Sequence, residues 1–75
     1  MKTEDDLLAR IVVNPKVMTG KPVLKGTRIT VELVLRLLAQ GLSAEEILKD
    51  YPQLTKDDIT AVLLYAVKRA SEVIQ

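Results

Sequence analysis

The sequence predicts a mainly α-helical fold, a three-helix helix-turn-helix bundle preceded by a short N-terminal β-ribbon. Residues 30–75 repeat the apolar spacing of a helix, and each repeat opens with a residue that caps helices well. Residues 10–29 instead hold short β-branched runs separated by proline and glycine. The chain has 75 residues, which suits a single domain. We therefore expect one domain over residues 1–75, with residues 1–9 as an N-terminal segment.

The composition leaves little material for catalysis. The chain has no cysteine and no histidine, which removes thiol nucleophiles, imidazole bases and the usual zinc ligands. We expect a protein that is not an enzyme and that needs no cofactor or metal. The apolar runs are too short to cross a bilayer and no segment resembles a signal peptide, so we expect a cytoplasmic protein without membrane contact. A core this small also favours a homodimer.

A short helix and a first strand are predicted at the N-terminus. Thr3 is followed by three acidic residues, which is typical of a helix start, so residues 4–9 are expected to form one or two turns. Residues 11–13 are all β-branched and end at an Asn-Pro turn signal, which predicts a short strand. Residues 17–18 are expected to form a second strand fragment.

The rest of the ribbon is expected to be a tight hairpin. Residues 23–24 and 27–29 flank Lys25 and Gly26, and the glycine can take the positive φ that such a turn requires. Pro22 cannot donate a ladder hydrogen bond, so its strand should begin there or lie at an edge.

The first helix of the bundle is predicted to start at Thr30, which can cap it, and to end at Gly41. Gly41 supplies a left-handed residue and Leu42 an apolar one, as a Schellman ending requires. The apolar face of this helix consists of Val31, Val34, Leu35 and Leu38, widened by Leu33 and Leu37. Glu32 and Arg36 are spaced for an ion pair on the polar face.

Two further helices open with capping boxes. Ser43 and Glu46 form the first box, and the helix after it should stop just before Pro52. Thr55 and Asp58 form the second box, and its helix is expected to run to about residue 72. The apolar residues of this last helix fall on two stripes, one of Ile59, Val62, Leu63, Ala66 and Ala70, the other of Leu64, Val67 and Ile74. One domain has too few partners for both stripes, so a second subunit is expected to cover the second stripe or the ribbon.

Positive charge is concentrated in one third of the chain. Residues 1–9 carry −2, residues 10–36 carry +5 and residues 37–75 carry −2, which sum to the net +1. A solvated basic surface and a phosphate-binding surface both explain this excess. Aromatic residues make up only 3% of the chain, which argues against base stacking on single strands and favours double-stranded DNA.

Two groups of residues are candidate DNA contacts. On the ribbon these are Lys21, Lys25 and Arg28, with Arg28 as the base reader because its planar guanidinium suits guanine. At the start of the third helix of the bundle they are Thr55, Lys56 and Thr60. Residues 55–60 carry a net −1, which disfavours phosphate approach, although helix capping also explains the two aspartates. An ion pair between Arg28 and Glu32 is the structural alternative for Arg28.

Four segments of the chain resemble the family called domain of unknown function 433. They are Ile11-Val12-Val13-Asn14-Pro15, then Gly20-Lys21-Pro22-Val23-Leu24-Lys25-Gly26-Thr27-Arg28-Ile29, then Gly41-Leu42-Ser43 with Glu46-Ile47-Leu48, and Tyr51-Pro52-Gln53-Leu54-Thr55. The resemblance covers about residues 10 to 70, and the second segment is its specific part. Many relatives have proline after the isoleucine of that segment, whereas this chain has Thr30.

The resemblance implies a fold and a function. The family is known as homeodomain-like, and many members are similar to VapB-type antitoxins that are encoded beside a PIN-like ribonuclease toxin. It therefore implies an antitoxin of a type II toxin–antitoxin system that neutralises the toxin and represses its own operon as a dimer. The alternative from a different class is a protein-interaction module without DNA binding, whose ribbon or exposed helix stripe binds an acidic partner. The antitoxin hypothesis and the protein-interaction hypothesis are both correct if Arg28 blocks the acidic metal site of such a nuclease.

Overall fold

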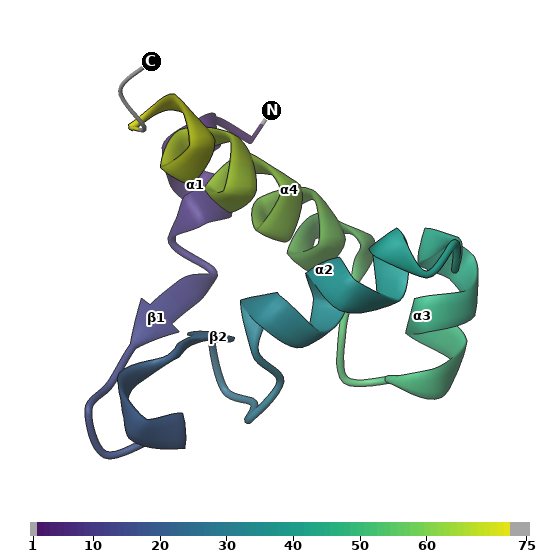
Figure 1. Cartoon of the computed structure of the whole chain (residues 1–75), viewed down its shortest axis with the longest axis horizontal. Helices are drawn as coiled ribbons and strands as arrows, with labels where there is room; N and C mark the ends of the chain where they lie inside the picture. The colour runs from purple at the N-terminus through teal and green to yellow at the C-terminus, as the bar shows by residue number, and fades with distance from the viewer. Residues whose placement is uncertain (1, 73–75) are drawn as a thin grey trace.

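The computed structural model describes residues 2–72, and within that range the fold is mainly helical with one small sheet (Figure 1). The elements in chain order are α1 (Glu4–Leu8), β1 (Ile11–Val13), a 3₁₀ turn η1 (Met18–Gly20), β2 (Pro22–Leu24), α2 (Val31–Ala39), α3 (Ala44–Asp50) and α4 (Lys56–Ser71). Both α1 and α2 pack against the long helix α4, and α3 packs against α2 and α4. The prediction of a mainly helical fold with a small antiparallel sheet is confirmed.

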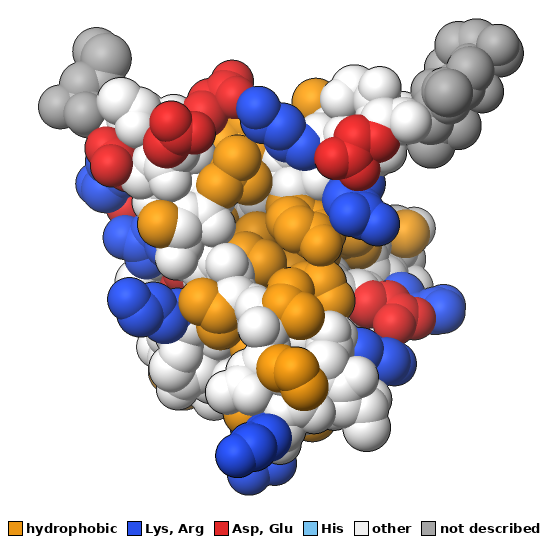
Figure 2. All heavy atoms as spheres, turned by 90° about the vertical axis from the view of Figure 1, so that its left-hand side faces the viewer, with side chains coloured by type: hydrophobic (Ala, Val, Ile, Leu, Met, Phe, Trp, Pro, Cys, Tyr) orange, Lys and Arg blue, Asp and Glu red, His pale blue; other side chains and the backbone are white. Residues whose placement is uncertain are grey.

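The core joins the ribbon to the helices. Its buried residues come from β2, the loop after it, α2, α3, the turn before α4, and α4 itself: Leu24, Ile29, Val31, Val34, Ile47, Leu54, Ile59 and Val62. Leu24 is 1% exposed and Ile47 is 0% exposed, so the ribbon contributes to the same core as the helices. On the side of the molecule that carries α1 and β1, apolar side chains gather in the middle of the face with charged side chains around them (Figure 2).

The predicted helix ends are confirmed by their hydrogen bonds. Each of α1, α3 and α4 opens with a capping box, formed by Thr3 with Asp6, Ser43 with Glu46, and Thr55 with Asp58. After α2, the Leu42 N–H donates to the Leu37 carbonyl at 3.2 Å and the Gly41 N–H donates to the Leu38 carbonyl at 3.0 Å. Gly41 has φ +96°, so the Schellman ending is present as predicted.

The pairing predicted within the ribbon is wrong. Strand β2 pairs antiparallel with β1, with Ile11 opposite Leu24 and Val13 opposite Pro22, so β2 does begin at the proline. Residues 27–29 form no strand, and beyond β2 only an isolated bridge joins Val23 to Thr30. The reason is tertiary, because Ile29 is buried in the core and the chain turns inward there to start α2.

The strand fragment predicted at residues 17–18 is also wrong. The chain there enters the turn η1, in which Met18, Thr19 and Gly20 have φ of 50°, 53° and 81°. This left-handed stretch reverses the chain so that β2 can return along β1. The conformation costs a non-glycine residue free energy, which is why local propensity did not indicate it.

The buried face of α4 differs from the one predicted. Asp58, Ile59, Ala61 and Val62 are buried, whereas Leu63 is 47% exposed and Ala70 is exposed. The cause is that α1 and α2 both pack on α4 and together shift the covered arc. Among the second stripe, Leu64 is half-buried, Val67 is 62% exposed and Ile74 lies outside the described residues.

Candidate nucleic-acid interface

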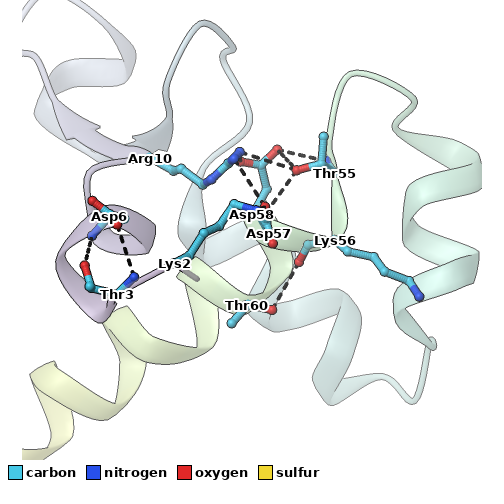
Figure 3. Close-up of polar contacts among 9 residues, drawn as sticks. All are labelled: Lys2, Thr3, Asp6, Arg10, Thr55, Lys56, Asp57, Asp58 and Thr60. Atoms are coloured by element: carbon cyan, nitrogen blue, oxygen red, sulfur yellow. Dashed lines mark hydrogen bonds and ion pairs between the residues drawn. The ribbon is translucent and has the colours of Figure 1, made fainter.

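The first turn of α4 is held by a polar cluster that includes Arg10 (Figure 3). The Asp58 carboxylate accepts from the Thr55 backbone N–H at 2.8 Å and from the Thr55 hydroxyl at 3.2 Å. Its other oxygen accepts from Arg10 Nη1 at 3.2 Å. Asp58 is only 9% exposed, so this guanidinium supplies the counter-charge that a buried carboxylate needs.

Asp57, beside it, is also neutralised. Lys2 Nζ lies 2.9 Å from its carboxylate and Arg10 Nη2 lies 3.4 Å from it. The hydrogen bond from Lys2, aided by the charges of Lys2 and Arg10, lowers the pKa of Asp57 below its ordinary value. Residues 55–60 carry −1 by themselves, and adding Lys2, Arg10 and the neighbouring Asp6 gives −1 + 2 − 1 = 0. The acidic charge that disfavoured DNA contact at this helix start is therefore offset within the protein.

The loop after β2 lies beside the same helix start. Its Lys25 lines a hollow with Asp6, Gln53, Thr55 and Asp58. A neighbouring hollow contains Arg28 and the same Gln53. The Lys25 backbone N–H donates to the Arg10 carbonyl at 2.7 Å, so Arg10 ties the loop to α4 through both its backbone and its side chain.

The loop cations have no carboxylate partner among residues 2–72. Lys25 and Arg28 are exposed, and neither forms an ion pair there. The alternative pairing of Arg28 with Glu32 is absent, because Glu32 binds Arg36 at 3.0 Å and Lys21 at 3.5 Å instead. The hydrogen bond from Arg36 and the charges of Lys21 and Arg36 lower the pKa of Glu32.

The predicted contact residues at the start of α4 differ in whether their side chains are already hydrogen-bonded within the protein. Lys56 is exposed and extends away from the Arg10–Asp58 cluster (Figure 3). Thr60 is exposed, but its hydroxyl donates to the Lys56 carbonyl at 3.2 Å. The Thr55 hydroxyl is engaged with Asp58 and Arg10. Lys56 is therefore the side chain of the three that is free to bind a phosphate.

The structure places the predicted contact residues on three parts of the surface. Lys25 lines one hollow together with the α4 cap Thr55, and Arg28 lines the neighbouring hollow together with Gln53 from the turn before that cap. Lys56 and Thr60 lie in the first turns of α4 but line neither hollow. Lys21 lines a separate groove between α2 and α4, where it pairs with Glu32.

Two residues at this surface were not predicted as site residues. Gln53 lines both hollows, and an exposed amide can donate to a phosphate or read a base edge. Its only sequence signal was its place in the turn before the α4 cap. Arg10 belongs to the basic third of the chain, but nothing local in the sequence reveals a partner 48 residues away.

Among residues 2–72, no three acidic side chains come together in a way that would hold a metal ion. The helices of the described part are also too short or too polar to cross a membrane.

Other proteins are similar to this chain in sequence, and one solved structure is similar to it in fold. The family described as "Protein of unknown function (DUF433)" matches residues 11–66. The uncharacterised protein y4eO of Sinorhizobium fredii is 35% identical over 65 residues, which cover 83% of this chain and 29% of y4eO. An uncharacterised protein of Archaeoglobus fulgidus is 57% identical over 30 residues, which cover 40% of this chain and 83% of that protein.

A solved structure gives the same result. The crystal structure of a DUF433 member from Anabaena variabilis matches with a TM-score of 0.78 and 30% identity, over 84% of this chain and 62% of that one. This chain thus spans less than a third of y4eO and under two thirds of the Anabaena protein. The match of sequence and fold together shows that the chain belongs to the DUF433 family.

Proposed function

We propose that this protein acts by binding, as the antitoxin of a type II toxin–antitoxin system. In this proposal it binds operator DNA as a dimeric autorepressor and holds a PIN-like ribonuclease toxin inactive in the cytoplasm. The helices α2, α3 and α4 are then the three helices of a homeodomain-like unit, and α4 is the helix that approaches the DNA. The family resemblance suggests the pairing with a toxin, and the surface chemistry supports the DNA contact.

The observation that carries the DNA proposal is the group of unpaired cations around the start of α4. Lys25 and Arg28 on the loop and Lys56 on the helix form no ion pair within the described residues, while Asp57 and Asp58 are neutralised internally. Free cations release counterions from DNA when they bind phosphates, whereas paired cations must first lose their partner. The loop and the helix can thus contact one duplex together.

Self-association would supply the second half of the contact surface. Lys56, Thr60, Leu63 and Val67 lie on one exposed stripe of α4, and its last two members are 47% and 62% exposed. Apolar side chains on a dimer interface would gain burial that a single copy does not provide.

Fluorescence anisotropy with a labelled duplex from the region upstream of the gene tests DNA binding. Replacing Lys25 and Arg28 together by Ala should raise Kd by about tenfold or more at low salt. In a dimer this removes two phosphate contacts from Lys25 and two base contacts from Arg28, so the slope of log K against log salt should lose about 1.8 in magnitude, at 0.9 per phosphate contact.

Lys21→Ala is the matched control, because it removes a ribbon cation that lies in the other groove. It should leave Kd within about twofold, since a single distant exposed charge contributes little at this range. An equal loss in Lys21→Ala, or no binding of the wild-type protein at low salt, would reject the proposed interface.

The second candidate is a protein-interaction module that binds no DNA. The exposed Leu63 and Val67 favour it, because apolar side chains on the outer stripe of α4 suit a protein partner better than a phosphate backbone. The two candidates separate when Leu63→Ser is compared with Lys56→Ala. Loss of duplex binding in Lys56→Ala with an unchanged oligomeric state supports the DNA contact, and weaker duplex binding together with a weaker dimer in Leu63→Ser supports the stripe as the dimer interface. Unchanged duplex binding in both variants contradicts the role of α4.

A further inference from the structure

A second surface lies away from the proposed DNA contacts, in the groove between α2 and α4. The groove has a volume of about 620 Å³, and its apolar lining consists of Pro22, Val31, Leu35, Ala39, Tyr65 and Ala66. Neither Lys25 nor Arg28 nor Lys56 lines it. The face viewed in Figure 2 carries apolar surface in its middle with charged side chains around it, which is the arrangement that binding grooves commonly have.

The rim of the groove is positively charged. Lys21, Arg36 and Arg69 line it together with one acid, Glu32, so the rim carries +3 − 1 = +2. Glu32 is already shared by Lys21 and Arg36, and Arg69 pairs weakly with Glu72 at 3.6 Å while lying 6.0 Å above the Tyr65 ring. An occupant with acidic side chains at its edges would therefore match this rim.

The spacing of the apolar residues along the groove favours a helical partner. Val31, Leu35 and Ala39 are spaced by four residues along α2, so the apolar wall follows one face of that helix. Eight residues of α2 rise about 12 Å, which matches roughly two turns of a second helix packed alongside. A helix of that length presents apolar anchors at i, i+4 and i+7, the usual way in which an amphipathic helix enters a groove.

We infer that the groove between α2 and α4 receives an amphipathic helix of a protein partner, whose apolar face packs on Leu35, Ala39 and Tyr65 and whose acidic flanks meet Lys21, Arg36 and Arg69. The exposed stripe of α4 in a second copy is a poorer match, because it carries Lys56 and no acid, and two cationic surfaces repel. The inference extends the proposed function by assigning the surface for the protein partner, and it does not require DNA binding.

The test titrates the isotope-labelled full chain with a synthetic helical peptide and follows amide shifts by NMR. The probe carries leucine at i, i+4 and i+7 with glutamates flanking them, and the control peptide has lysines in place of the glutamates. We expect shifts at Val31, Leu35, Ala39 and Tyr65 with the acidic peptide, and about tenfold weaker binding of the basic peptide.

Two single substitutions at the end of α2 form a matched pair. Ala39→Glu places a carboxylate in the groove and should raise the Kd of the acidic peptide at least tenfold, which corresponds to about 1.4 kcal/mol of binding free energy. Gln40→Glu adds the same charge one residue outside the groove lining and should change Kd less than about twofold. Both substitutions sit at the C-terminal end of α2, so their effects on helix stability are alike.

Four outcomes would overturn the inference. The first is no shift up to millimolar peptide, the second is equal binding of the two peptides, and the third is equal loss of binding in the two variants. The fourth is movement of the same amide signals on diluting the protein alone, which would make the occupant a second copy. A duplex titration under the same conditions should move Lys25, Arg28 and Lys56 instead. A negative result for peptide binding in the groove is therefore distinguishable from a negative result for DNA binding.

Discussion

The arm formed by residues 10–29 and the helices of residues 30–72 are held in place in different ways. Each of α2, α3 and α4 has its start fixed by a side chain that caps a backbone N–H three residues later. The arm contains only two strands of three residues, and a hairpin of that size is not stable alone. Its position depends on contacts with residues far along the chain, such as Arg10 with Asp58.

This difference explains how the proposed DNA surface is built. The helical part presents Lys56 from a locally specified helix, whereas Lys25 and Arg28 come from a loop whose place is set by Arg10 and by the burial of Leu24. A helix start and a loop become one surface only when the arm is docked. Stability of the arm and binding by its cations are therefore coupled.

The largest expected effect tests whether the arm belongs to the common core. Leu24→Ala should lower the free energy of unfolding by about 2–5 kcal/mol, as should Ile47→Ala in α3, because both side chains are fully buried in one cluster. Urea unfolding measures both. The arm would not belong to the common core if Leu24→Ala lowered the free energy of unfolding by less than about 1 kcal/mol while Ile47→Ala lowered it by the full 2–5 kcal/mol.

The next effect concerns the link between the arm and α4. Arg10→Met should cost about 1–2 kcal/mol, less than a fully buried pair, because the Arg10 side chain is 34% exposed and screened by solvent. Lys2→Met is the control and should cost under about 0.5 kcal/mol, since Lys2 is 56% exposed. Urea unfolding of Arg10→Met in an Asp58→Asn background should show a smaller loss; equal losses in both backgrounds would contradict the link.

A smaller effect of opposite sign is expected in the turn η1. Thr19 holds φ +53°, a conformation that glycine adopts freely, so Thr19→Gly should raise stability by about 1 kcal/mol despite the extra freedom of the unfolded chain. Ser43→Ala in the helical part should instead lower it by about 1 kcal/mol through loss of a cap. Thermal unfolding compares the two, and a loss in Thr19→Gly would mean that the left-handed turn is not strained.

The smallest effect is the contribution of Asp57 to the pH dependence of stability. Its pKa is lowered in the folded state, so below its ordinary value the unfolded chain binds more protons and folding becomes weaker. Stability should therefore fall as pH drops from about 5 through the folded pKa, and Asp57→Asn should flatten that fall. Thermal unfolding between neutral and acid pH measures it; an unchanged slope in Asp57→Asn would show that its ion pairs with Lys2 and Arg10 contribute nothing.

Most residues of the candidate surface could be predicted from the sequence, but which of them lie together in the structure could not. The cations were identified as contacts because their charge is local information. That Lys21 lies in the α2–α4 groove while Lys25 and Arg28 lie at the start of α4 depends on how β2 pairs and where Ile29 is buried. Leu63 was assigned to the core for the same reason, because periodicity shows which residues share a face but not which face is covered.

The sequence by itself determined where each helix begins and ends, because a cap, a capping box or a Schellman glycine acts within about five residues of its partner. It also determined the excess of positive charge in the first half. Only the tertiary structure decided that β1 pairs with β2, that Arg10 neutralises a helix start 48 residues away, and that α2 and α4 leave an apolar groove. These features depend on packing between distant segments, and several arrangements of such segments satisfy the same local preferences.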